Sequence, residues 1–265
     1  VIQAIKDQTD RFIHYSYTDF YYENYVDLGE TLHDLIPGDF EKKFFYGNSG
    51  AESVEAAIKL SRWHSRRQGL LAYIGAFHGR TLGAVSLTAS KPAQRRYFAP
   101  LIPGVEHIFY PYCYRCPFNL EHPDCGYRCV TYVDDYLFHK FVPPEEVAMI
   151  LVEPIQGEGG YVVPPDGYFK ALRELCDEHG ILMAADEIQS GLGRTGKWFA
   201  SEHFDLVPDI VCMAKGIAAG LPLGVTASRA DLMDWTPGSH ASTFGGNPVS
   251  ASAAIELITG MSFSP

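Results

Sequence analysis

The chain has 265 residues, 46% of them hydrophobic, which is enough to bury the core of one large α/β domain or two small ones. The formal net charge of −11 argues against nucleic acids and anionic membranes as partners, because these bind clustered Lys and Arg. Since the sequence has neither an apolar run of about eighteen residues nor a signal peptide, we expect a soluble, cytoplasmic protein.

Both ends of the sequence look interrupted. It begins without a methionine inside a helix-like segment, and it closes on ITGMSFSP directly after another helix-like segment, ASAAIELI. We therefore expect a piece of a longer protein.

From residue 49 onward, helical segments alternate with short apolar runs. Residues 49–69 are predicted to form a helix that Gly69 stops, and residues 167–180 to form another. The apolar runs predict strands at 70–77, 147–154, 181–188, 209–214 and 223–228. This alternation is typical of a parallel sheet with helices on both faces.

Four side chains that could carry chemistry lie at the carboxyl ends of these strands: Phe77, Glu153, Asp186 and Lys215. The carboxyl ends of parallel strands meet at one edge of the sheet, where such folds bind their ligands. We therefore expect the four side chains at a common site.

The turn NSGAE opens the helix predicted at 49–69. The backbone N–H groups of Gly50 and Ala51 could bind a phosphate at the positive end of the helix dipole. The alternative is a simple cap, because Ser49 followed by Glu52 has the spacing of a capping box.

The segment AFHGRT places Phe77 and His78 just past a strand. Phe77 could stack on a planar ligand, and Gly79 lets the backbone approach closely. The alternatives are core packing for Phe77 and a structural role for His78.

Asp186 and Glu187 are adjacent carboxylates at the end of an apolar strand, where an unpaired anion is unfavourable. A protonated ring nitrogen of a cofactor would suit Asp186, because the ion pair keeps the ring able to accept electrons. Arg194 or a metal ion is the alternative partner.

Lys215 follows the apolar run DIVCMA, and one strand brings it back to the edge that carries Asp186. Apolar surroundings favour the uncharged amine, which can form a Schiff base with an aldehyde. The alternative is a helix-start lysine whose amine reaches solvent. Residues 239–248 add hydroxyls and glycines that suit a phosphate, so the whole set meets the requirements of a pyridoxal 5'-phosphate (PLP) site.

The residues at this point resemble the class III (ornithine/4-aminobutyrate type) aminotransferases of PLP fold type I. The matching segments, in family order, are NSGAESVEAAIKLSR, FHGRTLGA, EPIQGEGGY, ADEIQSGLGRTGKWFA, PDIVCMAKGIAAGLPLG and STFGGNP. The resemblance implies a large PLP-binding α/β domain over 36–265, with a mostly parallel seven-stranded sheet and helices on both faces. It also implies that residues 1–35 are the remnant of an N-terminal segment, and that the small C-terminal domain is absent.

The resemblance implies that Lys215 joins PLP covalently and moves the substrate proton, while Asp186 pairs with the pyridine nitrogen. Further cofactor contacts are implied as well. Phe77 would stack on one face of the ring with support from His78, and Ile188 would contact the opposite face. Gln189 would contact the ring hydroxyl, and the backbone of Gly50 and Ala51 would bind the phosphate.

An obligate homodimer is implied as well, because Thr243 matches a threonine that reaches the phosphate in the neighbouring subunit. Two further matches concern the substrate. Glu153 matches a glutamate beside the active site, and Glu158 resembles a gate glutamate that pairs with an arginine of the C-terminal domain. Since that domain is absent, substrate recognition is expected to be incomplete.

A cysteine-rich insertion over 111–130 departs from the family pattern. Cys113, Cys116, Cys125 and Cys129 have the spacing CxxC followed by CxxxC, which can build a zinc or cluster site. The alternative is two disulfides. The family's ordinary site needs no metal.

The expected reaction is transfer of an amino group to a 2-oxo acid from an ω-amino or basic amino acid, such as 4-aminobutyrate or ornithine. A PLP-dependent amino-acid racemase would use the same residues. Two hypotheses without this activity remain open, namely a chain that lacks full activity and a metal-binding module built on the four cysteines.

Overall fold

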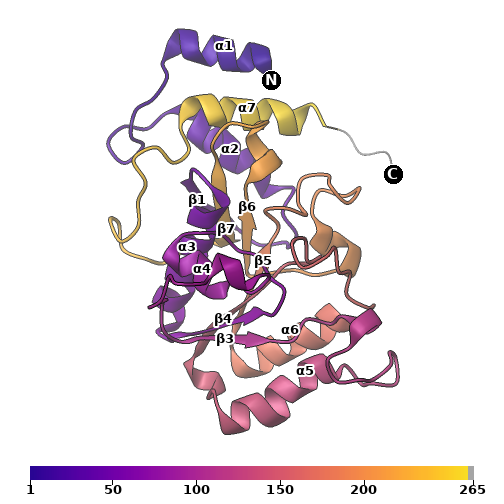
Figure 1. Ribbon diagram of the computed structural model, residues 1–265. Coiled ribbons are helices and arrows are strands. Elements are labelled where there is room, and N and C mark those ends of the chain that lie inside the picture. Colours follow the sequence, from indigo (N-terminus) through magenta and orange to yellow (C-terminus); the bar gives the residue numbers. More distant parts are fainter. Residues whose placement is uncertain (262–265) are drawn as a thin grey trace.

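The computed structural model describes residues 1–261 and is built around one seven-stranded sheet (Figure 1). Its strands are β1 (Lys42–Gly47), β2 (Gly69–Tyr73), β3 (Val105–Ile108), β4 (Val147–Val152), β5 (Leu182–Asp186), β6 (Ile210–Met213) and β7 (Gly224–Arg229). The strand order is β1-β7-β6-β5-β4-β2-β3. The five strands from β3 to β6 in this order are parallel, and β7 and β1 are antiparallel to their neighbours. The predicted mostly parallel, seven-stranded sheet is therefore confirmed.

Seven α-helices accompany the sheet in the described range: α1 (Ile2–Arg11), α2 (Glu23–His33), α3 (Gly50–Ser65), α4 (Leu82–Leu87), α5 (Arg128–Tyr132), α6 (Tyr168–His179) and α7 (Pro248–Thr259). Helices α1 and α2 both pack on α7, so the segment 1–35 joins the end of the described chain in space (Figure 1). None of the helices over residues 1–261 has the length and apolar character needed to cross a membrane. The last four residues of the predicted large domain, 262–265, lie outside the described residues.

Strand β4 shows how the sheet is covered on both faces. All six of its residues are buried. Ile150 and Val152 pack into the core formed with α5 and α6, whereas Met149 and Leu151 pack into the core formed with α3 and α4. A parallel strand buried on both faces is a continuous apolar run, which is why VAMILV lacks alternation.

The predicted helix at 49–69 ends early, and the expectation that Gly69 stops it is wrong. Arg66 takes the left-handed conformation, with φ of 59°, and its N–H bonds the carbonyl of Arg62. Gly69 instead begins β2, where a Cβ would lie 2.9 Å from the carbonyl oxygen of Glu146. Glycine therefore lets β2 approach the chain that enters β4.

The strand predicted at 70–77 also ends early, at Tyr73, because the chain turns at Gly75 with φ of 89°. The turn frees Phe77 and His78 from the sheet and directs them to the edge where β4, β5 and β6 also end. Helix α6 ends at the predicted glycine, since Gly180 has φ of 62°. Strands β1 and β3 were not predicted.

Candidate active site

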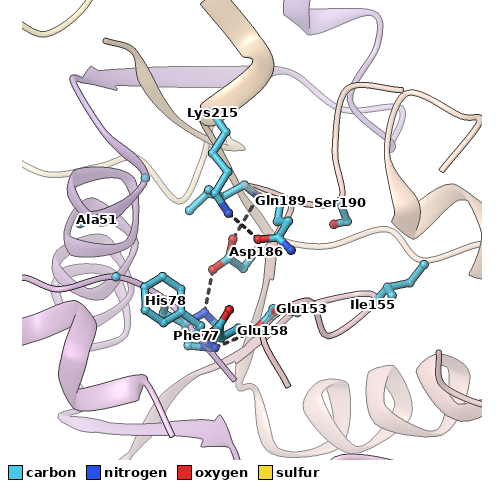
Figure 2. Close-up of a pocket in the computed structure, with 13 residues that line it drawn as sticks. Ala51, Phe77, His78, Glu153, Ile155, Glu158, Asp186, Gln189, Ser190 and Lys215 are labelled. Atoms are coloured by element: carbon cyan, nitrogen blue, oxygen red, sulfur yellow. Dashed lines mark hydrogen bonds and ion pairs between the residues drawn. The ribbon is translucent and has the colours of Figure 1, made fainter. Parts of the chain in front are cut away.

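A cavity of about 150 Å³ lies at the carboxyl ends of β2, β4, β5 and β6 (Figure 2). It gathers residues from five separated segments. The residues that line it are Gly50, Ala51, Phe77, His78, Gly79, Glu153, Ile155, Glu158, Asp186, Ile188, Gln189, Ser190 and Lys215. The expectation that Phe77, Glu153, Asp186 and Lys215 share one sheet edge is confirmed by this cavity.

Asp186 is buried and held by two donors. Its Oδ2 lies 2.7 Å from Nδ1 of His78, and its Oδ1 accepts the N–H of Ile188 at 3.0 Å. Among the described residues the side-chain partner is therefore His78 and not Arg194, which was the side-chain partner expected from sequence. Nε2 of His78 is buried and has no hydrogen-bond partner in the described chain.

Lys215 begins a single 3-10 turn directly after β6, with φ of 51°. A positive φ is uncommon for a residue with a side chain and is found at functional sites more often than elsewhere. Its Nζ donates to Oε1 of Gln189 at 2.7 Å. The turn directs the Lys215 side chain into the cavity, which Phe77 and Ile188 also line, and the side chain is exposed there.

The start of α3 forms one wall of the cavity. Ser49 caps the helix by accepting the N–H of Glu52 at 3.3 Å. The carboxylate of Glu52 accepts the N–H of Asn48 rather than that of Ser49, so the predicted capping box is only half formed. The N–H groups of Gly50 and Ala51 belong to the first turn, where no helical acceptor is available to them.

The close approach of Ile188 to this wall depends on glycine. A Cβ at Gly50 would lie 2.9 Å from Cγ2 of Ile188. Phe77 and Ile188 thus line the same cavity as the helix start. Thr243, by contrast, is exposed and does not line it. Its neighbour Ser242 accepts a hydrogen bond from Nδ2 of Asn48 at 3.1 Å, which places the 239–248 loop beside the entrance to α3.

Glu153 is buried and joins two loops of the cavity. Its carboxylate oxygens accept the N–H groups of Phe77 at 2.8 Å and Gly157 at 2.7 Å. Burial raises the pKa of Glu153 above its usual range, although His78 and the two amides oppose this shift. Because both oxygens are engaged by backbone, the geometry favours a positioning role over direct contact with a substrate.

Glu158 lies at the mouth of the cavity and pairs with Lys91, whose Nζ is 2.5 Å from its Oε1. This hydrogen bond and the charge of Lys91 lower the pKa of Glu158. Sequence reasoning did not identify Lys91, because no local pattern links it to a glutamate that follows it by 67 positions.

A second residue that sequence reasoning assigned no role is Glu187. Its buried carboxylate accepts the Oγ–H of Ser190 at 2.6 Å and the N–H groups of Ala200 at 3.1 Å and Ser201 at 2.8 Å. These bonds fold the segment 187–201 back on itself. They thereby fix the turn that carries Gln189, which in turn holds Lys215. The adjacent carboxylates in the sequence were the one available signal.

A sequence model of the class-III aminotransferases matches residues 1–262. The chain belongs to this family, whose cofactor is PLP.

Relatives with different reactions align over almost the whole chain. It is 43% identical over 259 residues to the leucine/methionine racemase of Thermococcus litoralis, and 43% identical over 260 residues to the acetylornithine aminotransferase of Methanopyrus kandleri. These alignments cover 97% and 98% of the chain but only 58% and 60% of the two relatives. An (S)-enantioselective omega-transaminase structure from Thermomicrobium roseum superposes with a TM-score of 0.89 at 32% identity, covering 97% of the chain and 60% of that structure. The chain thus spans about 60% of the length of these proteins.

Proposed function

We propose that the chain carries the PLP site of an enzyme that transfers an amino group from an amino acid to a 2-oxo acid. The observation that carries this proposal is the meeting of Lys215, the Asp186–His78 pair and the start of α3 around one cavity. An ω-amino or basic amino acid, such as 4-aminobutyrate or ornithine, is the proposed donor. The relatives named for acetylornithine and omega-amino transfer support that choice.

The residues of the cavity suit the chemistry of PLP. The carboxylate of Asp186 would hold the pyridine nitrogen, and His78 would hold that carboxylate in place through its Nδ1. Phe77 and Ile188 would cover the two ring faces, and Gln189 would contact the ring hydroxyl. The free N–H groups of Gly50 and Ala51 would bind the phosphate. When bound, PLP supplies an electron sink for the bonds of the carbon that carries the amino group.

Lys215 is the proposed proton carrier, because its amine is exposed in the cavity and free of any carboxylate partner in the described chain. Gln189 orients the amine through a neutral hydrogen bond, so Lys215 can leave this contact without breaking an ion pair. Arg80, whose guanidinium lies 5.4 Å from the centre of the Phe77 ring, and Lys91 supply positive charge near the mouth. That positive charge suits the carboxylate of an amino or oxo acid. Glu158 is proposed to face the substrate, and its negative charge would partly balance that of Lys91.

A racemase is the second candidate, and the observation that favours it is the 43% identity to a leucine/methionine racemase. Transfer and racemisation share the removal of a proton and differ in where a proton returns. Product analysis separates them. Amino transfer yields a 2-oxo acid from the donor, whereas racemisation yields the D-amino acid without any oxo acid.

We also propose a homodimer with shared active sites. The exposed position of Thr243 outside its own cavity supports this, since the side chain is available to a neighbouring chain. Sedimentation of the purified protein with and without PLP tests the proposal, and a monomer under both conditions would contradict it.

The PLP site itself is tested by adding PLP, reducing the sample with borohydride and mapping the labelled peptide. We expect the label on Lys215 and its loss in Lys215→Ala. Lys170→Ala is the matched control, because Lys170 is an exposed lysine of α6 that does not line the cavity. Label at Lys215 without either product would mean that the chain binds PLP but lacks activity as it stands. No label at Lys215 would refute the proposal.

A further inference from the structure

The cysteines of the segment 111–130 converge on one small cavity that shares no lining residue with the proposed PLP site. Cys113, Cys116, Cys125 and Cys129 all line it, together with His122. The cavity measures about 20 Å³, which is room for a single water molecule or ion. Two chain segments thus bring four sulfurs and one imidazole around a space for one small occupant.

These donors have no other use that the described structure reveals. All four cysteines are free thiols, and Nδ1 of His122 is buried without a hydrogen-bond partner among the described residues. Buried polar atoms are nearly always paired with protein, water or an ion. His122 is thus a polar side chain of the cavity wall, available to a water molecule rather than to an ion that already has four cysteine ligands.

The thiols also disfavour one another's ionisation. Burial raises the pKa of Cys129 to about 12, and the neighbouring Cys125, Cys113 and Cys116 contribute to this rise. Burial likewise raises the pKa of Cys113, again with contributions from Cys125 and Cys116. A divalent cation in their midst would reverse the effect, because it stabilises thiolates.

We propose that Cys113, Cys116, Cys125 and Cys129 bind one zinc ion. Zinc prefers four thiolates in a tetrahedral arrangement, with Zn–S distances of about 2.3 Å. Binding would release the thiol protons to solvent. A single ion fits the size of the cavity, whereas an iron–sulfur cluster adds several atoms of its own.

The side chains must turn inward to reach this geometry. In the described chain, no three of the sulfurs lie within 4.8 Å of one another, a spacing met only by Asp134, Glu178 and His179. Cys113 is exposed and begins one 3-10 turn, and Cys116 is half-buried and follows the last residue of that turn. Rotations about χ1 can therefore bring both sulfurs toward Cys125 and Cys129.

The zinc site would support the neighbouring PLP pocket. The same cavity is lined by Tyr110, which is buried and whose hydroxyl donates to the carbonyls of Glu153 at 2.9 Å and Pro154 at 3.2 Å. Tyr127, between Cys125 and Cys129, donates to the carbonyl of Asp166 at 2.8 Å. The bound ion would thus fix an insertion that contacts the strand end carrying Glu153.

The test begins with the whole protein, purified with a reductant and without added metal. Elemental analysis is expected to find about one zinc per chain. The variant with both Cys113→Ser and Cys116→Ser should hold at least about tenfold less zinc. Cys176→Ala is the matched control, because Cys176 is buried in α6 and does not line the cavity, so this variant should keep its zinc.

A second measurement needs no variant and covers the case in which the double variant fails to fold. Titrating the wild-type protein with a mercurial should release zinc in step with the loss of the four thiols. Zinc at trace level with freely reacting thiols would overturn the proposal. So would a mass showing two disulfides, or iron with inorganic sulfide in place of zinc.

Discussion

Glu187→Ala is expected to lower the free energy of unfolding substantially. The substitution removes the acceptor of three buried donors, the hydroxyl of Ser190 and the N–H groups of Ala200 and Ser201. An unsatisfied buried donor costs about 1–3 kcal/mol, so three of them would cost about 3–9 kcal/mol. Since water can enter the space left behind and bond some of these donors, we expect a loss of about 3–5 kcal/mol in total.

Urea unfolding followed by circular dichroism measures this loss. Glu174→Gln is the control, because Glu174 is exposed on α6, where substitutions change stability by about 0.5 kcal/mol or less. Activity should fall as well, because the turn that carries Gln189 loses its anchor. A loss below about 1 kcal/mol in Glu187→Ala would show that the segment 187–201 does not depend on this carboxylate.

Glu187 should also make the free energy of unfolding depend on pH, and the direction of this dependence follows from its pKa. Burial raises the pKa of Glu187 above its usual 4.5, against the opposing hydrogen bonds from Ser190, Ser201 and Ala200. The folded state then binds this proton more tightly than the unfolded state does. The free energy of unfolding from this group is therefore highest below pH 4.5 and falls as the pH rises through the raised value. Glu187→Ala should lack that decline. An equal slope in both proteins would contradict the assignment.

Three further substitutions test other parts of the site. Gly79→Ala should destabilise the fold by about 1–3 kcal/mol in urea unfolding, because φ is +138° and the new Cβ would lie 2.9 Å from the Cβ atoms of Ala51 and Ala84. An unchanged unfolding midpoint would contradict this prediction. Asp186→Ala should reduce turnover more than PLP affinity, since the carboxylate is proposed to hold the charge of the ring; equal losses would argue against that role. Lys91→Ala should return the pKa of Glu158 toward its usual value, as followed by carbon-13 NMR of the carboxyl group, and no shift would exclude the ion pair in solution.

The sheet was predictable from sequence where strands are buried on both faces. The run VAMILV, with helices predicted around it, indicates a buried strand, and β4 consists of these six residues. Strand β1 escaped prediction because KKFFYG begins with two lysines and gains its place only by pairing with β7. Strand β3 is four residues long, VEHI, and three of them are only half-buried. Edge strands such as β1 and β3 depend on a neighbouring strand that the local sequence does not identify.

The site was predictable in its composition but not in its contacts. Asp186 and Lys215 stand out because a charged residue after an apolar strand needs an explanation. The side-chain partner of Asp186 is His78, which is 108 positions away in the sequence and is brought there by the turn at Gly75. Lys215 also has a backbone φ of 51°, a conformation that no side-chain pattern in the sequence encodes.

The carboxylate of Asp186 is immobilised before any ligand arrives. One oxygen is tied to the chain two residues ahead, at Ile188, and the other to His78, so the group cannot rotate about its last bond without losing both. A ligand that needs this anion meets it already aligned, and the entropic cost of orienting it has been met during folding. Glutamate, with one more methylene, could not span both contacts from the same backbone position. Asp186→Glu would therefore keep the negative charge but lose the fixed orientation of the carboxylate.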